Sequence, residues 1–181
     1  AGEQGVRFAA VLAGGRRLGV AGRGGMGSVM GAKRLKAVVV KGSRRTEIAD
    51  REALTGILKR RHNALKGNTR AFALYGTPIL LSTINAVGLL GTRNNTREVW
   101  EHPEAIGHEL LKEQYWEEDV SCHGCPVGCG KKIRVKKGPY QGAAVKMPEY
   151  ETLYALGTML DNRDLDAIFE ANHLCNLLGI D

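Results

Sequence analysis

The sequence has few aromatic residues, few cysteines and no long apolar run. Aromatic residues make up 6% of the 181 residues, which is too few for the stacking platform of a protein that binds single-stranded nucleic acid. No stretch approaches the roughly 18 consecutive apolar residues of a membrane-spanning helix, and the amino terminus lacks the layout of a signal peptide. We therefore expect a cytoplasmic protein that binds neither membrane nor nucleic acid.

The remaining composition is that of a globular protein, with 43% hydrophobic and 25% charged residues. The formal net charge of +7 favours an anionic partner. Because the basic residues are spread over several clusters, a solvated basic surface and a functional anion-binding surface both stay open. The chain begins with Ala1 rather than Met and ends at Asp181 directly after a helical pattern. We therefore expect a piece of a longer polypeptide.

The first quarter of the sequence predicts two short strands around a glycine-rich loop. Residues 6–12 have the composition of a strand, residues 14–31 are dense in glycine, and residues 35–41 contain three successive valines. These features indicate the end of a mixed α/β domain. The breaker sequence at residues 42–45 places a domain boundary there, so that one domain comprises residues 1–42 and the next residues 43–181.

The second domain is predicted to be mainly helical. Asp50 is expected to cap a helix that buries Leu54, Ile57, Leu58 and Leu65, and Thr77-Pro78 opens another helix that ends near Gly88. Further helices are expected from Pro103 to Tyr115, at about 149–159 and at about 164–178. Between residues 121 and 140 the periodicity disappears, and residues 133–135 predict one strand of a small hairpin. The fold class is therefore α+β, the helical domain carrying a cysteine-rich loop.

Three cysteines in eight residues are the most informative segment. Cys122, Cys125 and Cys129 are spaced so that their thiolates can converge on one metal centre, with Gly124 and Gly128 allowing tight turns. A short run of three cysteines with a remote fourth ligand is typical of a [4Fe–4S] cluster. Zinc, with His123 or Cys175 as fourth ligand, is the alternative. Cys175 lies on an apolar helix face, where a lone cysteine is more often a small buried hydrophobe.

A second motif is the glycine-arginine loop at residues 22–27, Gly-Arg-Gly-Gly-Met-Gly. It contains the pattern G-x-G-x-x-G, but the next predicted strand follows too closely for a dinucleotide-binding crossover. Its clustered glycines, Gly22, Gly24 and Gly25, can expose backbone N–H groups, and Arg23 can bind phosphate oxygens. A phosphate-bearing cofactor is the functional interpretation, and a plain surface loop is the alternative.

With both motifs in view, the chain resembles the tungsten-containing aldehyde:ferredoxin oxidoreductase family. The matching stretches occur in family order and are residues 7–9 (Arg-Phe-Ala), 22–37, 75–78 (Tyr-Gly-Thr-Pro), 122–129, 148–152 (Pro-Glu-Tyr-Glu-Thr) and 174–181. The resemblance implies tungsten, or molybdenum, held by two pterins near one [4Fe–4S] cluster. The fourth cluster cysteine would then lie beyond residue 181.

The resemblance also implies which residues bind the cofactor. Gly22 and Arg23 would contact pterin phosphate, and the backbone of Gly19 and Val20 would lie near a bridging Mg²⁺. Residues 176–181 resemble a pterin-binding Asp-x-x-Gly-Leu-Asp motif, in which Asn176 replaces the first aspartate, Ile180 replaces the leucine, and Asp181 would accept hydrogen bonds from pterin nitrogens.

Glu149 and Glu151 stand in the Pro-Glu-Tyr-Glu match, and one of them resembles a glutamate near the metal that can move a proton; Glu151 is slightly favoured. The alternative is an acidic residue at a helix amino terminus. The implied reaction is oxidation of an aldehyde to a carboxylic acid, with electrons passing to ferredoxin or an electron-transfer subunit.

Other interpretations stay open at this point. Lys131, Lys132, Lys136 and Lys137 are expected to steer an acidic electron acceptor, and a homodimer is compatible with the resemblance. The competing hypotheses are a family member with another substrate, such as an aromatic acyl-CoA reductase subunit, and a zinc-bearing, anion-binding or nucleic-acid-binding module.

Overall fold

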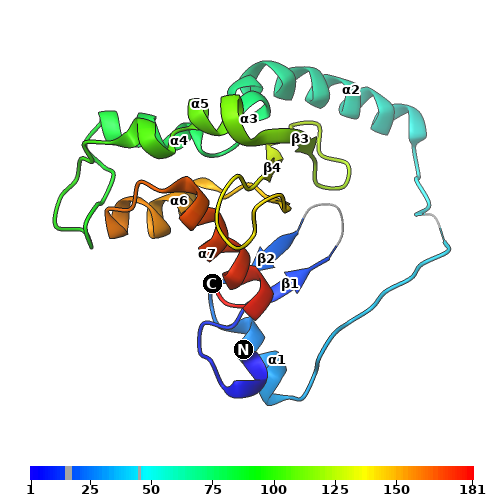
Figure 1. The fold of residues 1–181 in the computed structure, drawn as a ribbon. Coiled ribbons are helices and arrows are strands. Elements are labelled where there is room, and N and C mark those ends of the chain that lie inside the picture. Colours follow the sequence, from blue (N-terminus) through cyan, green and yellow to red (C-terminus); the bar gives the residue numbers. More distant parts are fainter. Residues whose placement is uncertain (15–17, 45) are drawn as a thin grey trace.

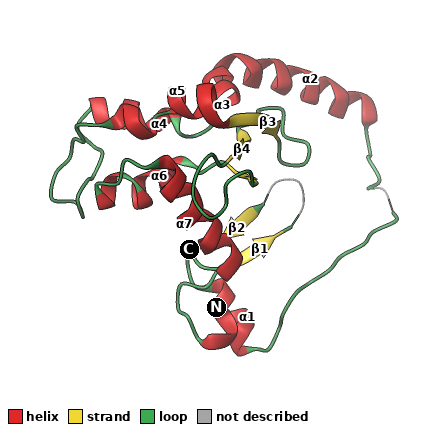
Figure 2. Cartoon of the chain, viewed as in Figure 1, coloured by secondary structure: helices red, strands yellow, loops and turns green. Residues whose placement is uncertain are grey.

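The computed structural model describes residues 1–14, 18–44 and 46–181 and has an α+β fold (Figures 1 and 2). The amino-terminal part contains a 3-10 helix (Gly2–Gln4), the antiparallel pair β1 (Val11–Ala13) and β2 (Gly19–Ala21), and α1 (Met26–Ala32). The larger part contains α2 (Arg51–Asn68), α3 (Arg70–Tyr75), α4 (Ile79–Ala86), α5 (His108–Leu110), α6 (Tyr150–Leu156) and α7 (Leu165–Leu178). Its antiparallel sheet has the order β3 (Trp116–Val120), β4 (Gly130–Arg134), β5 (Ala144–Lys146).

One hydrophobic core lies between α4, α6, α7 and the β3–β4–β5 sheet. Trp100, Phe169 and Leu153 are among its fully buried members. The loop that carries Trp100 is fixed by polar contacts, because Asn85 of α4 donates to the Trp100 carbonyl oxygen and accepts from its N–H group, at 2.9 and 2.8 Å. The Trp100 indole N–H donates to Asp161 at 2.8 Å.

In residues 43–181, the predicted helix starts and ends are confirmed where capping residues fix them. Asp50 accepts a hydrogen bond from the Ala53 N–H at 2.8 Å, and Asp164 does the same for α7. Pro78 directly precedes α4, and Gly179 ends α7 in the left-handed conformation, with φ +67°. The segment from Pro103 to Tyr115 is helical but broken into a 3-10 turn, α5 and a π-helical turn (Leu111–Tyr115).

The strand predictions of the first part are largely wrong. Of the expected first strand at residues 6–12, only residues 11 and 12 belong to β1 and Ala9 forms an isolated bridge, and the glycine-rich run contains β2 and α1 in addition to loop. Residues 15–17 of that run, and Arg45 of the expected boundary, lie outside the described residues. Residues 35–41 form no strand, and Val39 is 91% exposed. A strand requires a hydrogen-bonded neighbour, and no described strand lies beside this segment.

Burial on α2 also differs from the expectation. The helix buries none of its residues, and Ile57, Leu58 and Leu65 are exposed while Leu54 is half-buried. After α1, residues 37–44 run as an extended segment away from the rest of the chain (Figure 1). The proposed division at residue 42 falls within this segment and stays a prediction.

The two ends of the chain lie together (Figure 1). Ala9 forms an antiparallel bridge with Ile180, the Ala10 N–H donates to the Gly179 carbonyl oxygen at 2.8 Å, and the Asp181 N–H donates to the Phe8 carbonyl oxygen at 3.1 Å. The end of α7 is therefore attached to the amino-terminal part. Within the described residues, no helix has both the length and the apolar character needed to cross a bilayer.

Candidate functional site

The three clustered cysteines lie on the loop between β3 and β4. The Cys125 N–H donates to the Cys122 carbonyl oxygen at 3.0 Å, which closes a turn, and Gly124 and Gly128 have φ values of +68° and +65°. Only glycine adopts this conformation readily, so both glycines shape the loop. Cys122 is exposed, Cys125 and Cys129 are half-buried, and no described cysteine forms a disulfide.

The thiol donors fit an iron-sulfur cluster by their chemistry, since thiolates on an irregular loop are its usual ligands. In the described parts of the chain, no three His, Cys, Asp or Glu side chains are gathered closely enough to hold a metal ion. Metal-binding loops close around their metal because ligand convergence and binding are coupled. The assignment of the three cysteines as ligands therefore stays a prediction. Cys175 lies on α7, half-buried.

One end of the cysteine loop is fixed by Lys131. Its ammonium group donates to the Asp119 carboxylate of β3 at 2.6 Å, to the Ala73 carbonyl oxygen of α3 at 2.5 Å and to the Gly128 carbonyl oxygen at 3.0 Å. The Lys131 side chain is 2% exposed. The expectation that Lys131 steers an electron acceptor is therefore wrong, because a buried charge held by three acceptors is not on the surface. Lys136 and Lys137 are exposed, and Lys132 is half-buried.

Residues 75–78 connect the cysteine loop to the candidate glutamate. Gly76 has φ +70°, and a side chain there would meet the Cys129 carbonyl oxygen at 2.8 Å and the Met147 side chain at 2.9 Å. The Thr77 hydroxyl donates to the Glu149 carboxylate at 2.6 Å and accepts from the Tyr150 N–H at 3.0 Å. The sequence marks residues 75–78 only as a stretch that resembles the family and as the start of a helix. Their place among the matching stretches was the signal that could have identified them as functional.

The two candidate glutamates have different environments. Glu149 precedes α6, and its side chain is 26% exposed. The Lys146 Nζ atom lies 3.4 Å from Oε1 of Glu149, whereas Thr77 binds Oε2. Glu151 lies in the first turn of α6 and is exposed. The contacts therefore hold Glu149 in place, whereas Glu151 has the position of an ordinary acidic residue at a helix amino terminus.

The structure brings the glycine-arginine loop to the end of the chain. A side chain on Gly22 would overlap the Asp181 carboxylate, so the two motifs that the sequence placed at a pterin are in contact. Gly24 and Gly25 have φ values of +88° and +68° and lead directly into α1, while Arg23 is exposed. Gly19 and Val20 lie on β2, paired with β1. Ile180 forms the bridge to Ala9.

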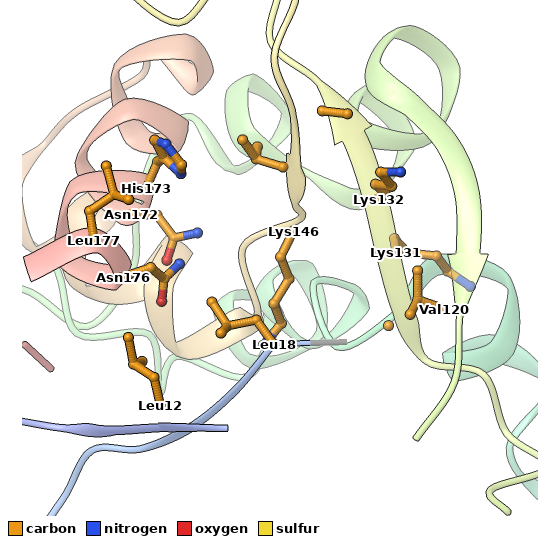
Figure 3. A pocket seen from close by; sticks show the side chains of 13 residues that line it. Leu12, Leu18, Val120, Lys131, Lys132, Lys146, Asn172, His173, Asn176 and Leu177 are labelled. Carbon is orange, nitrogen blue, oxygen red and sulfur yellow. The ribbon is translucent and has the colours of Figure 1, made fainter. Parts of the chain in front are cut away.

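A cavity of about 350 Å³ lies between the β1–β2 hairpin, α7 and the β3–β4–β5 sheet. Asn172, His173 and Asn176 project from α7 toward the strand that carries Lys146 (Figure 3). The edge of His173 packs on Tyr140, with ring centroids 4.8 Å apart. The cavity therefore combines apolar walls with amide, imidazole and ammonium groups, and Asn176 is the one predicted cofactor residue in its lining.

A second cavity, of about 700 Å³, separates α2 from the cysteine loop. Its lining includes Lys59, Arg61 and His62 of α2 and, on the other side, Cys125 and Pro126. The α2 sequence contains five Lys or Arg residues and one Glu. A basic surface on α2 is not expected from the sequence, because no local pattern shows that α2 lies beside the cysteine loop; the expectation for Lys132, Lys136 and Lys137 stays a prediction.

Comparisons with known proteins show which family the chain is similar to. Residues 1–42 match a family model described as the aldehyde ferredoxin oxidoreductase N-terminal domain, and residues 55–181 match that of domains 2 and 3. Over its whole length the chain is 41% identical to the tungsten-containing aldehyde ferredoxin oxidoreductase of Thermococcus kodakarensis and 39% identical to that of Pyrococcus furiosus. It is 32% identical, over 99% of its length, to a Pyrococcus furiosus aliphatic sulfonate oxidoreductase, WOR-like subunit. The chain spans 29% of the length of each of these relatives. With its family models covering residues 1–42 and 55–181, the chain belongs to the aldehyde ferredoxin oxidoreductase family.

Proposed function

We propose that the polypeptide containing this chain oxidises aldehydes to carboxylic acids, using a tungsten–pterin cofactor and a [4Fe–4S] cluster bound by Cys122, Cys125 and Cys129. The observation that carries this proposal is the segment at residues 75–78, which packs on Cys129 through Gly76 and holds Glu149 through Thr77. One turn thus connects a candidate proton carrier to a candidate electron carrier. The family of oxidoreductases to which the chain belongs supports the same reaction.

When bound, the tungsten–pterin unit supplies the two-electron oxidation, and the cluster passes the electrons on one at a time. Conversion of a hydrated aldehyde to the acid releases two electrons and two protons. In this proposal Glu149 accepts one of these protons, and the contacts of its two oxygens with Thr77 and Lys146, which hold the carboxylate in one orientation, support that role. The contacts favour Glu149 over Glu151, the residue that the sequence slightly favours.

The cofactor would be held where the two ends of the chain meet. In this proposal the N–H groups of Gly22, Gly24 and Gly25 and the Arg23 guanidinium bind pterin phosphate, and the backbone of Gly19 and Val20 lies near the bridging Mg²⁺. Asp181 accepts hydrogen bonds from pterin nitrogens, and Asn176 and Ile180 complete the same binding segment. The contact between Gly22 and Asp181 supports one shared site.

The electron acceptor is proposed to be ferredoxin or an electron-transfer subunit. Such proteins are commonly recognised by opposite charge, which raises the rate of encounter. Lys59 and Arg61 line the cavity that Cys125 also lines, and they are therefore better placed than Lys136 and Lys137 to receive an acidic acceptor.

The substrate is a separate question within the family. The relative named as an aliphatic sulfonate oxidoreductase subunit is 32% identical to this chain, so a second candidate function is oxidation or reduction of another substrate on the same scaffold. An aromatic acyl-CoA would be one such substrate. A zinc-bearing module is the third candidate, and metal analysis distinguishes it from both enzymes.

The proposal is tested on the full-length polypeptide, purified without oxygen from cells grown with and without tungstate. We expect aldehyde-dependent reduction of a viologen dye only in the tungsten-loaded protein, with the carboxylic acid as product. Tungsten-loaded protein that reduces the dye with aliphatic sulfonates but not with any aldehyde would favour the second candidate. Protein that binds zinc and neither iron nor tungsten would reject both enzyme functions.

A further inference from the structure

Lys131 is a buried cation beside the cysteine loop. Its side chain is 2% exposed, and three oxygens accept hydrogen bonds from its ammonium group: the Asp119 carboxylate and the carbonyl oxygens of Ala73 and Gly128. All three protons are thereby satisfied, which a buried ammonium group requires. Figure 3 shows the Lys131 side chain extending from β4 toward β3. This residue takes part in none of the steps described above.

The Lys131 ammonium group links the carboxyl-terminal end of the loop, at Gly128, to α3 and β3. Gly128 directly precedes Cys129, so the carbonyl group that Lys131 binds belongs to the peptide unit joined to that cysteine. The Cys129 carbonyl oxygen in turn lies against Gly76, where a side chain would approach it to 2.8 Å. The backbone before Cys129 is therefore bound by Lys131 and the backbone after it packs on Gly76, while Cys122 is at the exposed end.

We propose that Lys131 is a positioning residue for the cluster: it fixes the backbone at Cys129 and, through its buried positive charge, raises the cluster's reduction potential. The proposal rests on the proposed binding of a [4Fe–4S] cluster by the three cysteines. Reduction adds one negative charge to the cluster, and a nearby cation stabilises the reduced form more than the oxidised form. Cluster charge and surrounding hydrogen bonds are among the factors that set such potentials.

Asp119 partly opposes this effect. Its carboxylate is the ion-pair partner of Lys131, but its side chain is 56% exposed. Water and salt screen an exposed charge more strongly than a buried one. The charge of Lys131 therefore has the larger effect on the cluster. Removing the lysine charge and removing the aspartate charge should move the reduction potential in opposite directions.

The test is a mediated redox titration of the full-length protein, with the cluster followed by electron paramagnetic resonance. Lys131→Met should lower the equilibrium constant for one-electron reduction about tenfold, a shift of about 59 mV to more negative potential. Lys131→Arg, which keeps the charge, should have a reduction potential close to that of the wild type. Asp119→Asn should shift the potential to more positive values by a smaller amount, because the lysine charge is then unopposed. Lys137→Met removes an exposed lysine and is the matched control, with no shift expected.

The outcomes separate the role of Lys131 from the presence of the cluster. A wild-type protein without iron and without the cluster signal would reject the proposed function itself. A normal wild-type cluster with unmoved potentials in Lys131→Met and Asp119→Asn, or with shifts of the same sign, would reject the role of Lys131 alone. Should Lys131→Met lose the cluster, Asp119→Asn decides: a positive shift supports the proposal, and an absent or negative shift overturns it.

Discussion

Two glutamates that stand two positions apart in the sequence occupy different environments. Glu149 is bound by Thr77 and Lys146, whereas Glu151 is exposed on the first turn of α6. We expect Glu149→Gln to lower kcat for aldehyde oxidation by roughly 100-fold or more, the usual effect of losing a proton-transfer group. Glu151→Gln, the matched control, should stay within about threefold. Both are measured on full-length protein with equal iron and tungsten content, and the reverse order of effects would assign the role to Glu151.

Tyr115 offers a residue-scale test of the core. Burial, followed by the charge of Asp166, raises the pKa of Tyr115 to about 12, and its hydroxyl donates to Asp166 at 3.1 Å. Because the folded pKa lies above the unfolded value of 10.0, the contribution of this hydroxyl to stability is present below pH 10.0 and is lost as pH rises through about 12. Subtracting the tyrosinate absorbance titration of Tyr115→Phe from that of the wild type should give a step near pH 12. A step at the unfolded value would show that the hydroxyl is accessible to solvent.

At the scale of elements, prediction from sequence succeeded where local groups fix the backbone. Asp50 and Asp164 satisfy N–H groups at helix starts and Gly179 ends α7, so these boundaries follow from local chemistry. Residues 35–41 failed because strand formation depends on a neighbouring strand, which local composition does not provide. β3 was missed because Trp116–Val120 is charged and mostly exposed, without an apolar alternation.

The candidate site likewise has features that follow from local sequence patterns and contacts that do not. The cysteine spacing and the glycine-arginine loop are local patterns and could be read from the sequence. The contacts of Thr77 with Glu149 and of Lys131 with Ala73 join residues 72 and 58 positions apart. Such pairings arise from packing, and a single sequence carries no local signal for them.

The proposed acceptor surface consists of Lys59 and Arg61, the basic residues of α2 that line the second cavity. Lys59→Glu with Arg61→Glu should slow ferredoxin reduction at least tenfold at low ionic strength, and the difference from wild type should shrink as salt is added, because salt screens exposed charges. The paired control is Lys136→Glu with Lys137→Glu, which carries the same change of charge away from this cavity. Stopped-flow kinetics with full-length protein measures both. Equal slowing by the two double variants would indicate a general charge effect rather than a surface on α2.

At the scale of the whole molecule, the fold brings residues from both ends of the chain into one region. Phe8, Ala9 and Ala10 bind the backbone of residues 179–181, and Gly22 lies against Asp181. Residues 75–78 lie against the cysteine loop through Gly76 and bind Glu149 through Thr77. An arrangement of this kind can keep a phosphate-bearing cofactor, a proton carrier and a cluster in fixed relation, as oxidoreductase chemistry requires.

The central claim is that Cys122, Cys125 and Cys129 bind an iron-sulfur cluster. Electron paramagnetic resonance of the full-length polypeptide, purified without oxygen and reduced with dithionite, tests it most directly, together with iron and sulfide analysis of the same sample. We expect the signal of a reduced [4Fe–4S] cluster with about four iron and four sulfide ions per polypeptide, and its loss in Cys125→Ala. A colourless protein without a signal, carrying zinc at these thiolates, would contradict the account.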